Sequence, residues 1–480
     1  MLKNTLVYLL VMLVLGVGIY IILDAGSHLA PSGQNGSLVQ QASAAPPAAG
    51  GQPASGLLAN LSQPLSTLLL QIILIILAAR GLGMLFTRIG QPAVVGEMLA
   101  GIMLGPSLLG WLLPQVTALV FPAGSLSMLQ LLSQVGVILF MFMVGMELDL
   151  DHLRSQAYSV MFISHTSIML PFLLGTGLAL IIYPSMGPAG ISFPAFALFM
   201  GIAMSITAFP VLARIIEQRR LAGSSLGNLA IACAAVDDVT AWCVLAVVLC
   251  IARSSDLGQA ALTIGLALLF ALAMLLLVRP GLARMAVRFN RAGIDKKGLI
   301  AGALVFAFAS ALFTESIGIY ALFGAFLAGV VLPRPKALGV PIAEHLEAFT
   351  AFLLPLFFAF TGLRTQIGLL NDWGSWLLCF CVIAVAIAGK LGGASLAARS
   401  TGLSWQESLN VGALMNTRGL MELIAINIGY DLGILSTRMF AIMVIMALTT
   451  TVMTGPILSA LQYSQRRRRP ETVEREISVQ

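Results

Sequence analysis

Two adjacent acidic residues, Asp237 and Asp238, lie inside a long apolar stretch of this 480-residue chain. Neighbouring side chains on a helix point about 100° apart, so the two carboxylates cannot face the same way. One could face a cavity that takes a cation while the other reaches a fixed partner. Because a proton and a metal cation can compete for the same carboxylate oxygens, this pair suits proton-coupled cation binding. The alternative is a loop that exposes both acids to water.

A single lysine, Lys390, is predicted at membrane depth, within the glycine-rich run 388–393. The flanking glycines would allow another helix to approach closely. A buried charge usually faces a partner or a cavity, so we expect Lys390 to pair with Asp237 or Asp238. The alternative is a lysine whose long side chain reaches the cytoplasmic interface.

Two apolar segments are interrupted near their middles, one at residues 205–210 and the other at 416–419. Pro210 in the first run cannot donate a hydrogen bond to the carbonyl four residues before it. Matching broken helices in two halves of a chain are a strong sequence indication of a transport site. Freed carbonyls, with the side chains of Thr207 and Asn416, could bind a cation or offset helix-end dipoles. A kinked but continuous helix is the alternative for the first run.

Three more polar residues lie within apolar segments. Arg418 and Glu422 are four residues apart, so they can pair on one face of a helix. They could neutralise each other structurally or take a direct part in transport, and the sequence leaves both roles open. For the lone His165 we expect a packing role.

The composition indicates a membrane protein with many spans. Hydrophobic residues make up 59% of the chain and charged residues 10%, whereas soluble proteins carry about 25% charge. The same values exclude several soluble domains, long disorder and a disulfide scaffold. The net charge of +6 gives no reason to expect a nucleic-acid partner. The five cysteines lie in apolar runs without metal-ligand spacing, and we expect no cofactor.

The chain divides into an N-terminal span, a linker and a membrane domain. The first apolar run, 1–23, is expected to be a retained anchor, with a cleaved signal peptide as the alternative. Residues 24–64 are rich in Pro, Gly, Ala and Ser and indicate a flexible linker. The membrane domain is expected over 65–463, and 464–480 forms a basic tail. Its thirteen predicted spans are 65–87, 94–110, 127–146, 157–183, 195–216, 226–251, 258–278, 297–313, 317–332, 349–369, 376–398, 408–429 and 435–462.

Loop charges predict the orientation. If the amino terminus is cytoplasmic, only Arg253, Arg364 and Arg438 among the loop arginines and lysines fall outside. That strong positive-inside bias predicts a cytoplasmic C-terminus in a multi-pass protein of the plasma or inner membrane. The basic run 466–469 would fix this topology or contact anionic lipid. Thirteen spans divide as six, one and six, which permits two inverted repeats.

Several motifs together resemble a known family. The runs 205–214, 235–242 and 415–423 are similar to those of monovalent cation:proton antiporters. The similarity is greatest to the membrane part of the plant cation/proton exchangers and their bacterial relatives. It extends over about residues 60–463, and the runs 91–97 and 101–105 fit it as well.

The resemblance implies a fold and an activity. The fold would be an all-α antiporter fold of thirteen helices with inverted repeats and two crossed, discontinuous helices, here with one extra N-terminal helix. A mobile core, 157–251 and 376–462, would move against a dimer domain, 65–146 and 297–369, with 258–278 linking them. The protein would be a homodimer and not an enzyme. It would exchange Na⁺ or K⁺ for protons by an elevator mechanism and contribute to pH homeostasis.

The resemblance also assigns residue roles. It implies that Asp238 binds the transported cation and that Asp237 pairs with Lys390. The unwound crossing would contain Thr207 and the pair Asn416–Thr417, while Arg418 and Glu422 would be a supporting charge pair. Relatives with both acids and the lysine are often electrogenic, so we expect electrogenic exchange.

Two other function classes stay open from the residues alone. A gated cation channel on the same scaffold would conduct without a proton gradient. An intramembrane aspartyl protease needs two acids from separate helices, whereas Asp237 and Asp238 are adjacent, so this class is disfavoured.

Overall fold

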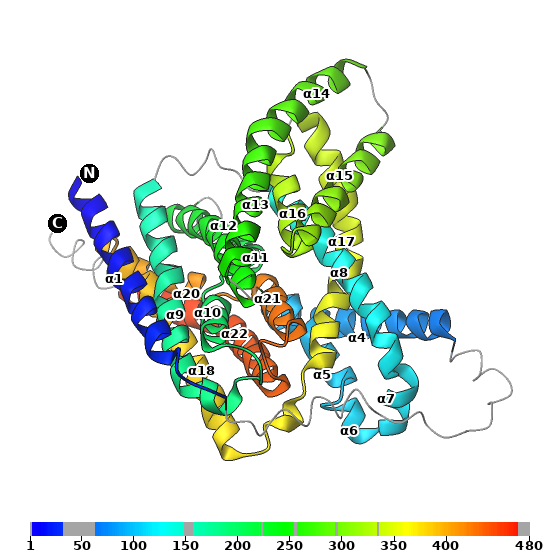
Figure 1. Ribbon diagram of the computed structural model, residues 1–480, viewed down its shortest axis with the longest axis horizontal. Helices are drawn as coiled ribbons and strands as arrows, with labels where there is room; N and C mark the ends of the chain where they lie inside the picture. The colour runs from blue at the N-terminus through cyan, green and yellow to red at the C-terminus, as the bar shows by residue number, and fades with distance from the viewer. Residues whose placement is uncertain are drawn as a thin grey trace, which may run out of the picture.

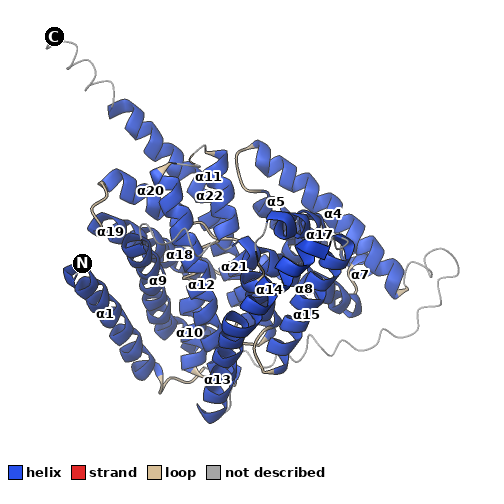
Figure 2. Cartoon of the chain, turned by 90° about the horizontal axis from the view of Figure 1, so that it is seen from above, coloured by secondary structure: helices blue, strands red, loops and turns tan. Residues whose placement is uncertain are grey.

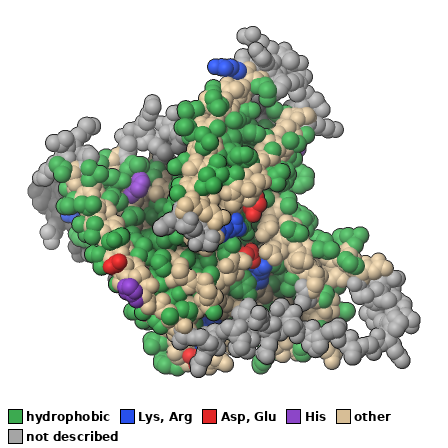
Figure 3. All heavy atoms as spheres, viewed as in Figure 1, with side chains coloured by type: hydrophobic (Ala, Val, Ile, Leu, Met, Phe, Trp, Pro, Cys, Tyr) green, Lys and Arg blue, Asp and Glu red, His purple; other side chains and the backbone are tan. Residues whose placement is uncertain are grey.

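The computed structural model describes residues 2–31, 63–147, 157–219, 221, 224–253, 257–292, 296–333 and 336–468. Most of the expected linker over 24–64, and the end of the basic tail, lie outside these residues. All regular elements in the described part of the chain are helices (Figure 2). Eleven of these helices are long and apolar enough to cross a membrane. Hydrophobic side chains cover much of the face seen in Figure 3, which agrees with the predicted all-α membrane fold.

The helices form two bundles that lie side by side (Figure 1). The first bundle contains α4 (Pro64–Arg88), α5 (Ala93–Leu104), α8 (Leu126–Glu147), α15 (Lys296–Ser316), α16 (Ala321–Val331) and α17 (Lys336–Arg364), with the short α6 (Leu109–Leu112), α7 (Pro114–Val120) and η1 (Ala123–Ser125) between α5 and α8. The second bundle contains α9 (Ala157–Met186), α10 (Phe193–Ala203), α11 (Phe209–Gln218), α12 (Ser225–Arg253), α18 (Trp373–Ile387), η5 (Ala388–Gly392), α19 (Gly393–Ser400), α20 (Trp405–Met415), α21 (Leu420–Asp431) and α22 (Thr437–Arg468), with the short η4 (Ile367–Leu369) before α18.

Close glycine contacts hold the first bundle together. A Cβ atom on Gly101 of α5 would collide with the backbone of Ala359 in α17, and one on Gly145 of α8 would collide with Phe326 of α16. Small residues at helix crossings let backbones approach closely, which favours packing where lipid supplies no hydrophobic driving force. At these two crossings the helices of the first bundle meet backbone to backbone.

The connection between the two halves of the chain is one long helical rod. It consists of α13 (Leu257–Ala273), the π-helical turn η3 (Met274–Val278) and α14 (Arg279–Ala292). The helix continues past Pro280, beyond residue 278, at which the expected membrane span ends. Likewise α17 begins at Lys336, well before the expected residue 349.

Three local interruptions lie in the second bundle. α10 ends at Ala203 before α11 begins at Phe209, and α20 ends at Met415 before α21 begins at Leu420. Both breaks fall where the sequence predicted them, so the alternative of a continuous kinked helix is wrong. The third interruption is η5, a π-helical turn that contains Lys390. Such turns inside α-helices often occur at functional sites.

The N-terminal helix α1 (Leu2–Gly26) lies against the second bundle, along α9 and α10 (Figure 2). It is apolar along its length, as expected for a membrane anchor.

Candidate functional site

The two broken helices contact each other directly at their unwound segments. The backbone N–H of Ala208 donates to the carbonyl oxygen of Thr417 at 3.0 Å. The Thr207 hydroxyl oxygen also lies 3.2 Å from the Met415 carbonyl oxygen. Two chain segments more than 200 residues apart thus satisfy each other's freed backbone groups, as broken helices inside a membrane require.

Arg418 caps the end of α10. Its guanidinium donates to the carbonyl oxygens of Ala203 at 3.2 Å and Met204 at 2.6 Å. It also forms an ion pair of 2.8 Å with Glu422, and both side chains are fully buried. A cation at a helix C-terminus offsets the negative end of the helix dipole. These contacts fit the structural role, one of the two roles that the sequence left open.

Asp237 is held by four side chains. Its Oδ2 lies 2.7 Å from Lys390 Nζ and accepts a hydrogen bond from Thr207 at 2.5 Å. The Ser164 hydroxyl donates to Oδ1 at 2.7 Å, and the Ser167 hydroxyl donates to Oδ2 at 3.5 Å. The Asp237 side chain is fully buried in α12, so the alternative of two acids in a water-exposed loop is wrong.

Lys390 has an acceptor for each of its three ammonium hydrogens. Besides Asp237, these are the carbonyl oxygens of Ser167, at 3.1 Å, and Ser205. The lysine side chain has no exposed surface. Lys390 therefore does not reach the membrane–water interface. The sequence offered Asp237 and Asp238 as its possible partners, and the structure pairs it with Asp237.

Asp238 points away from this cluster and has no comparable partners. It is 2% exposed, and neither carboxylate oxygen has a hydrogen-bond partner in the part of the chain that is described. The backbone N–H of Phe209, at the start of α11, lies close enough to attract the carboxylate but lacks the geometry of a hydrogen bond. Asp238 borders a gap in the packing that has no room for a water molecule, together with Ile206, Ala241, Trp242, Leu245 and Met421.

The second unwound segment also carries buried polar atoms without partners. Asn416 and Thr417 are fully buried. Within the described residues, neither the amide nitrogen nor the amide oxygen of Asn416 has a hydrogen-bond partner, and the Thr417 hydroxyl has none. Burying such groups without a hydrogen bond is costly. Every site residue that the sequence predicted thus lies in or beside the crossing.

Two site residues escaped the sequence analysis. Ser164 and Ser167 lie three residues apart on α9 and both contact Asp237. Their spacing on one helix face was the available signal. Serines at that spacing also occur in ordinary helix contacts, so the sequence alone could not single them out.

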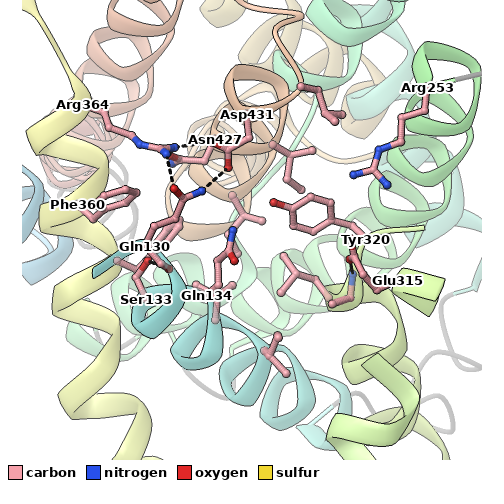
Figure 4. Close-up of a pocket in the computed structure, with 18 residues that line it drawn as sticks. Gln130, Ser133, Gln134, Arg253, Glu315, Tyr320, Phe360, Arg364, Asn427 and Asp431 are labelled. Carbon is pink, nitrogen blue, oxygen red and sulfur yellow. Dashed lines mark hydrogen bonds and ion pairs between the residues drawn. The ribbon is translucent and has the colours of Figure 1, made fainter. Parts of the chain in front are cut away.

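A cavity of about 400 Å³ lies between the two bundles (Figure 4). Arg364 of α17 forms an ion pair of 2.7 Å with Asp431 of α21 and donates to Gln130 of α8 at 2.9 Å. The Asn427 amide of α21 also donates to the Thr361 hydroxyl of α17 at 2.8 Å. The contacts Arg364–Asp431 and Asn427–Thr361 join the first bundle to the second, whereas Arg364–Gln130 lies within the first. None of the three could be expected from the sequence.

Comparison with known proteins identifies the family. The family model of the transmembrane sodium/hydrogen exchangers matches residues 72–462. The chain belongs to this family. The Na⁺/H⁺ antiporter NhaS4 of Synechocystis is 43% identical over 393 residues, which cover 82% of this chain and 96% of NhaS4. The resemblance drawn from the motifs is confirmed.

Longer members of the exchanger family match as well. Cation/H⁺ antiporter 17 of Arabidopsis thaliana is 39% identical over 84% of this chain. The K⁺/H⁺ antiporter 1 of Saccharomyces cerevisiae is 33% identical over 83%. The match covers 49% of the plant protein and 46% of the yeast protein, so this chain spans about half the length of these relatives.

A solved exchanger has the same fold. The sodium proton antiporter MjNhaP1 from Methanocaldococcus jannaschii superposes with a TM-score of 0.56, covering 84% of this chain and 97% of that one. The two sequences are 14% identical, so the likeness concerns the fold alone. The region matched by the family model begins after α1.

Proposed function

We propose that this protein exchanges a monovalent cation, Na⁺ or K⁺, for protons across a cell membrane. Relatives named as Na⁺/H⁺, cation/H⁺ and K⁺/H⁺ antiporters support this activity. Family membership also supports a transporter rather than an enzyme.

The contrast between Asp238 and Asp237 carries the proposal. Asp237 is neutralised by Lys390 and held by three hydroxyl groups, whereas Asp238 is buried with no hydrogen-bond donor of good geometry among the described residues. A buried carboxylate needs a compensating charge. A proton supplies it in one state and a cation in the other, so occupancy by one excludes the other.

Oxygens of the second unwound segment are proposed to complete the cation site. The Asn416 amide oxygen and the Thr417 hydroxyl are buried and unpartnered within the described residues, and both belong to the segment that crosses the start of α11. Hard cations prefer oxygen ligands. Asp238 would provide the charge, and these groups with Thr207 and the freed carbonyls would replace part of the hydration shell.

Net charge explains why the two fluxes are coupled. With Asp237 balanced by Lys390 and Arg418 balanced by Glu422, an ionised Asp238 leaves one uncompensated negative charge. Moving that charge past an apolar surface is unfavourable, whereas a proton or a cation bound at Asp238 cancels it. Only loaded forms therefore cross.

The movement is that of an elevator. The second bundle carries the site past the first bundle, which is held at the interface of a homodimer. Two contacts between the bundles must break during this movement: the hydrogen bond Thr361–Asn427 and the ion pair Arg364–Asp431. The cavity between the bundles is the water-accessible vestibule on the outer face, and the C-terminus is cytoplasmic.

The exchange is electrogenic. Asp238 alone accounts for one proton per cation, and the Asp237–Lys390 pair supplies a second one. Entry of the cation draws Asp237 towards it, and Lys390, losing its counter-charge, releases a proton. The cation-loaded site then carries one negative charge, the protonated site carries none, and the empty site with both protons released carries two. The difference between the first two makes the exchange electrogenic.

Purified protein in liposomes, with a pH-sensitive dye inside, tests the proposal. A proton gradient is imposed, the membrane potential is clamped, and Na⁺ or K⁺ is added separately. We expect the dye to report proton movement with one or both cations. Cation flux without proton movement would instead establish a channel, and no response to either cation would overturn the proposed substrates.

A further inference from the structure

The N-terminal helix α1 packs along the second bundle through one continuous face. The residues of this face recur every three or four positions, and the opposite face is exposed, as in a helix that lies between protein and lipid. The packed face comprises Tyr8, Val11, Leu15, Gly18, Ile19, Ile22 and Gly26, and the exposed face includes Leu6, Leu10, Leu13, Val17 and Tyr20.

Contacts along this face are close at both ends. The Tyr8 ring packs edge-on against Phe162 and His165, with centroid distances of 6.2 and 5.9 Å. At the other end, a Cβ atom on Gly26 would collide with the ring of Phe193. Gly18 in the middle meets Leu173 at similarly short range. Shape complementarity thus extends over nearly five turns.

The helix that α1 covers contributes two hydroxyl groups to the ion site. α9 directs Ser164 and Ser167 towards Asp237, while His165, between them in sequence, faces Tyr8. The His165 ring bonds to the Met161 carbonyl through Nδ1 at 2.8 Å. A histidine facing lipid is unfavourable, and Tyr8 of α1 covers part of the ring.

The position of α1 relative to the first bundle is equally informative. Figures 1 and 2 both show α1 on the side of the second bundle that lies away from α4 and α8. A helix in this place can follow the second bundle without sliding against the first.

We propose that α1 is a permanent member of the second bundle, retained in the mature protein, and that it moves with this bundle during transport. It shields the polar lipid-side surface of α9 behind the Asp237 cluster. The inference rests on the proposed function, since it assumes that the second bundle moves.

Two cysteine pairs in the full-length chain test the inference. Gly18→Cys/Leu173→Cys joins α1 to α9, and Thr361→Cys/Asn427→Cys joins the two bundles. Each is oxidised in proteoliposomes, and exchange is measured before and after reduction. The wild-type chain, with its five free cysteines, and each single variant receive the same oxidant. Should the first pair fail to fold, Gly26→Cys/Phe193→Cys tests the same packing at the other end of α1.

We expect the bridge between α1 and α9 to form and to leave exchange within about twofold of the reduced protein, whereas the bridge between the bundles lowers it about tenfold or more. A bridged α1 that stops exchange would show that α1 must leave α9, and absence of the bridge would show that it does not pack there. Either result overturns the inference. Unchanged exchange with the bundles bridged would instead overturn the elevator movement, independently of where α1 packs.

Discussion

Asp237 and Asp238 are consecutive residues of α12, yet their environments are opposite. Asp237 accepts hydrogen bonds from Ser164, Ser167, Thr207 and Lys390, while Asp238 has no hydrogen-bond partner among the described residues. Helical geometry explains the difference, because the side chains diverge by about 100°. Asp237 is thereby held in place, whereas the carboxylate of Asp238 is left without a bound partner and is proposed to take a proton or a cation.

Lys390→Ala is expected to destabilise the protein by about 3 kcal/mol, because it leaves the Asp237 carboxylate buried without its cation. The double variant Asp237→Asn/Lys390→Ala, which removes both charges, should recover part of this loss. Thermal unfolding of the detergent-purified variants measures both effects. A double variant no more stable than the single one would show that the ion pair does not carry the stability.

Ser164→Ala should cost about 1.5–3 kcal/mol, the range for hydrogen bonds to charged groups. Ser167→Ala provides the matched control, because its hydroxyl lies 3.5 Å from Asp237 rather than 2.7 Å and its effect should be smaller. The same unfolding assay ranks the two. Equal losses, or a larger loss for Ser167, would contradict the assigned geometry.

Arg418→Ala should reduce stability more than Glu422→Gln. Arg418→Ala removes the hydrogen-bond donors to two carbonyl oxygens at the end of α10 and leaves Glu422 without its ion-pair partner. Glu422→Gln, by contrast, keeps a polar side chain beside Arg418. Folded yield by size-exclusion chromatography and thermal unfolding test the order. If Arg418→Ala unfolds like the wild type but loses exchange, Arg418 acts in transport and not as a cap.

The electrical response of exchange tests the second proton. The rate of wild-type exchange in liposomes should change with an imposed membrane potential, because the proposed exchange moves two protons for each cation. In Lys390→Ala the pair cannot release a proton, so exchange that survives should lose this dependence. Potential-independent exchange by the wild-type protein would contradict electrogenic coupling.

The sequence predicted the broken helices and the depth of the charges well. Pro210 and the polar run 416–419 are local signals, and the apolar residues around Asp237, Asp238 and Lys390 fix their depth without knowledge of the packing. Family motifs carried the assignment of Asp237 to Lys390, which the residues alone left open.

Other features depend on which distant residues the fold brings together. The π-helical turn at Lys390 has no sequence signal that separates it from an ordinary helix with glycines. The contacts of Arg364 with Gln130 and Asp431 join residues from three distant helices. Arg364 could be recognised from sequence only as a loop charge, so its role between the bundles could not be predicted.

The central claim is that a proton and a cation compete at Asp238, and proton release on cation binding tests it most directly. Na⁺ or K⁺ is added to purified, weakly buffered protein, and the released protons are counted for the wild type and for Asp238→Asn, after both are shown to be folded. We expect the wild type to release protons, with an apparent cation affinity that rises with pH because the carboxylate must be deprotonated to bind. Asp238→Asn should release none. Wild-type proton release from Asp238→Asn would contradict the assignment of the site.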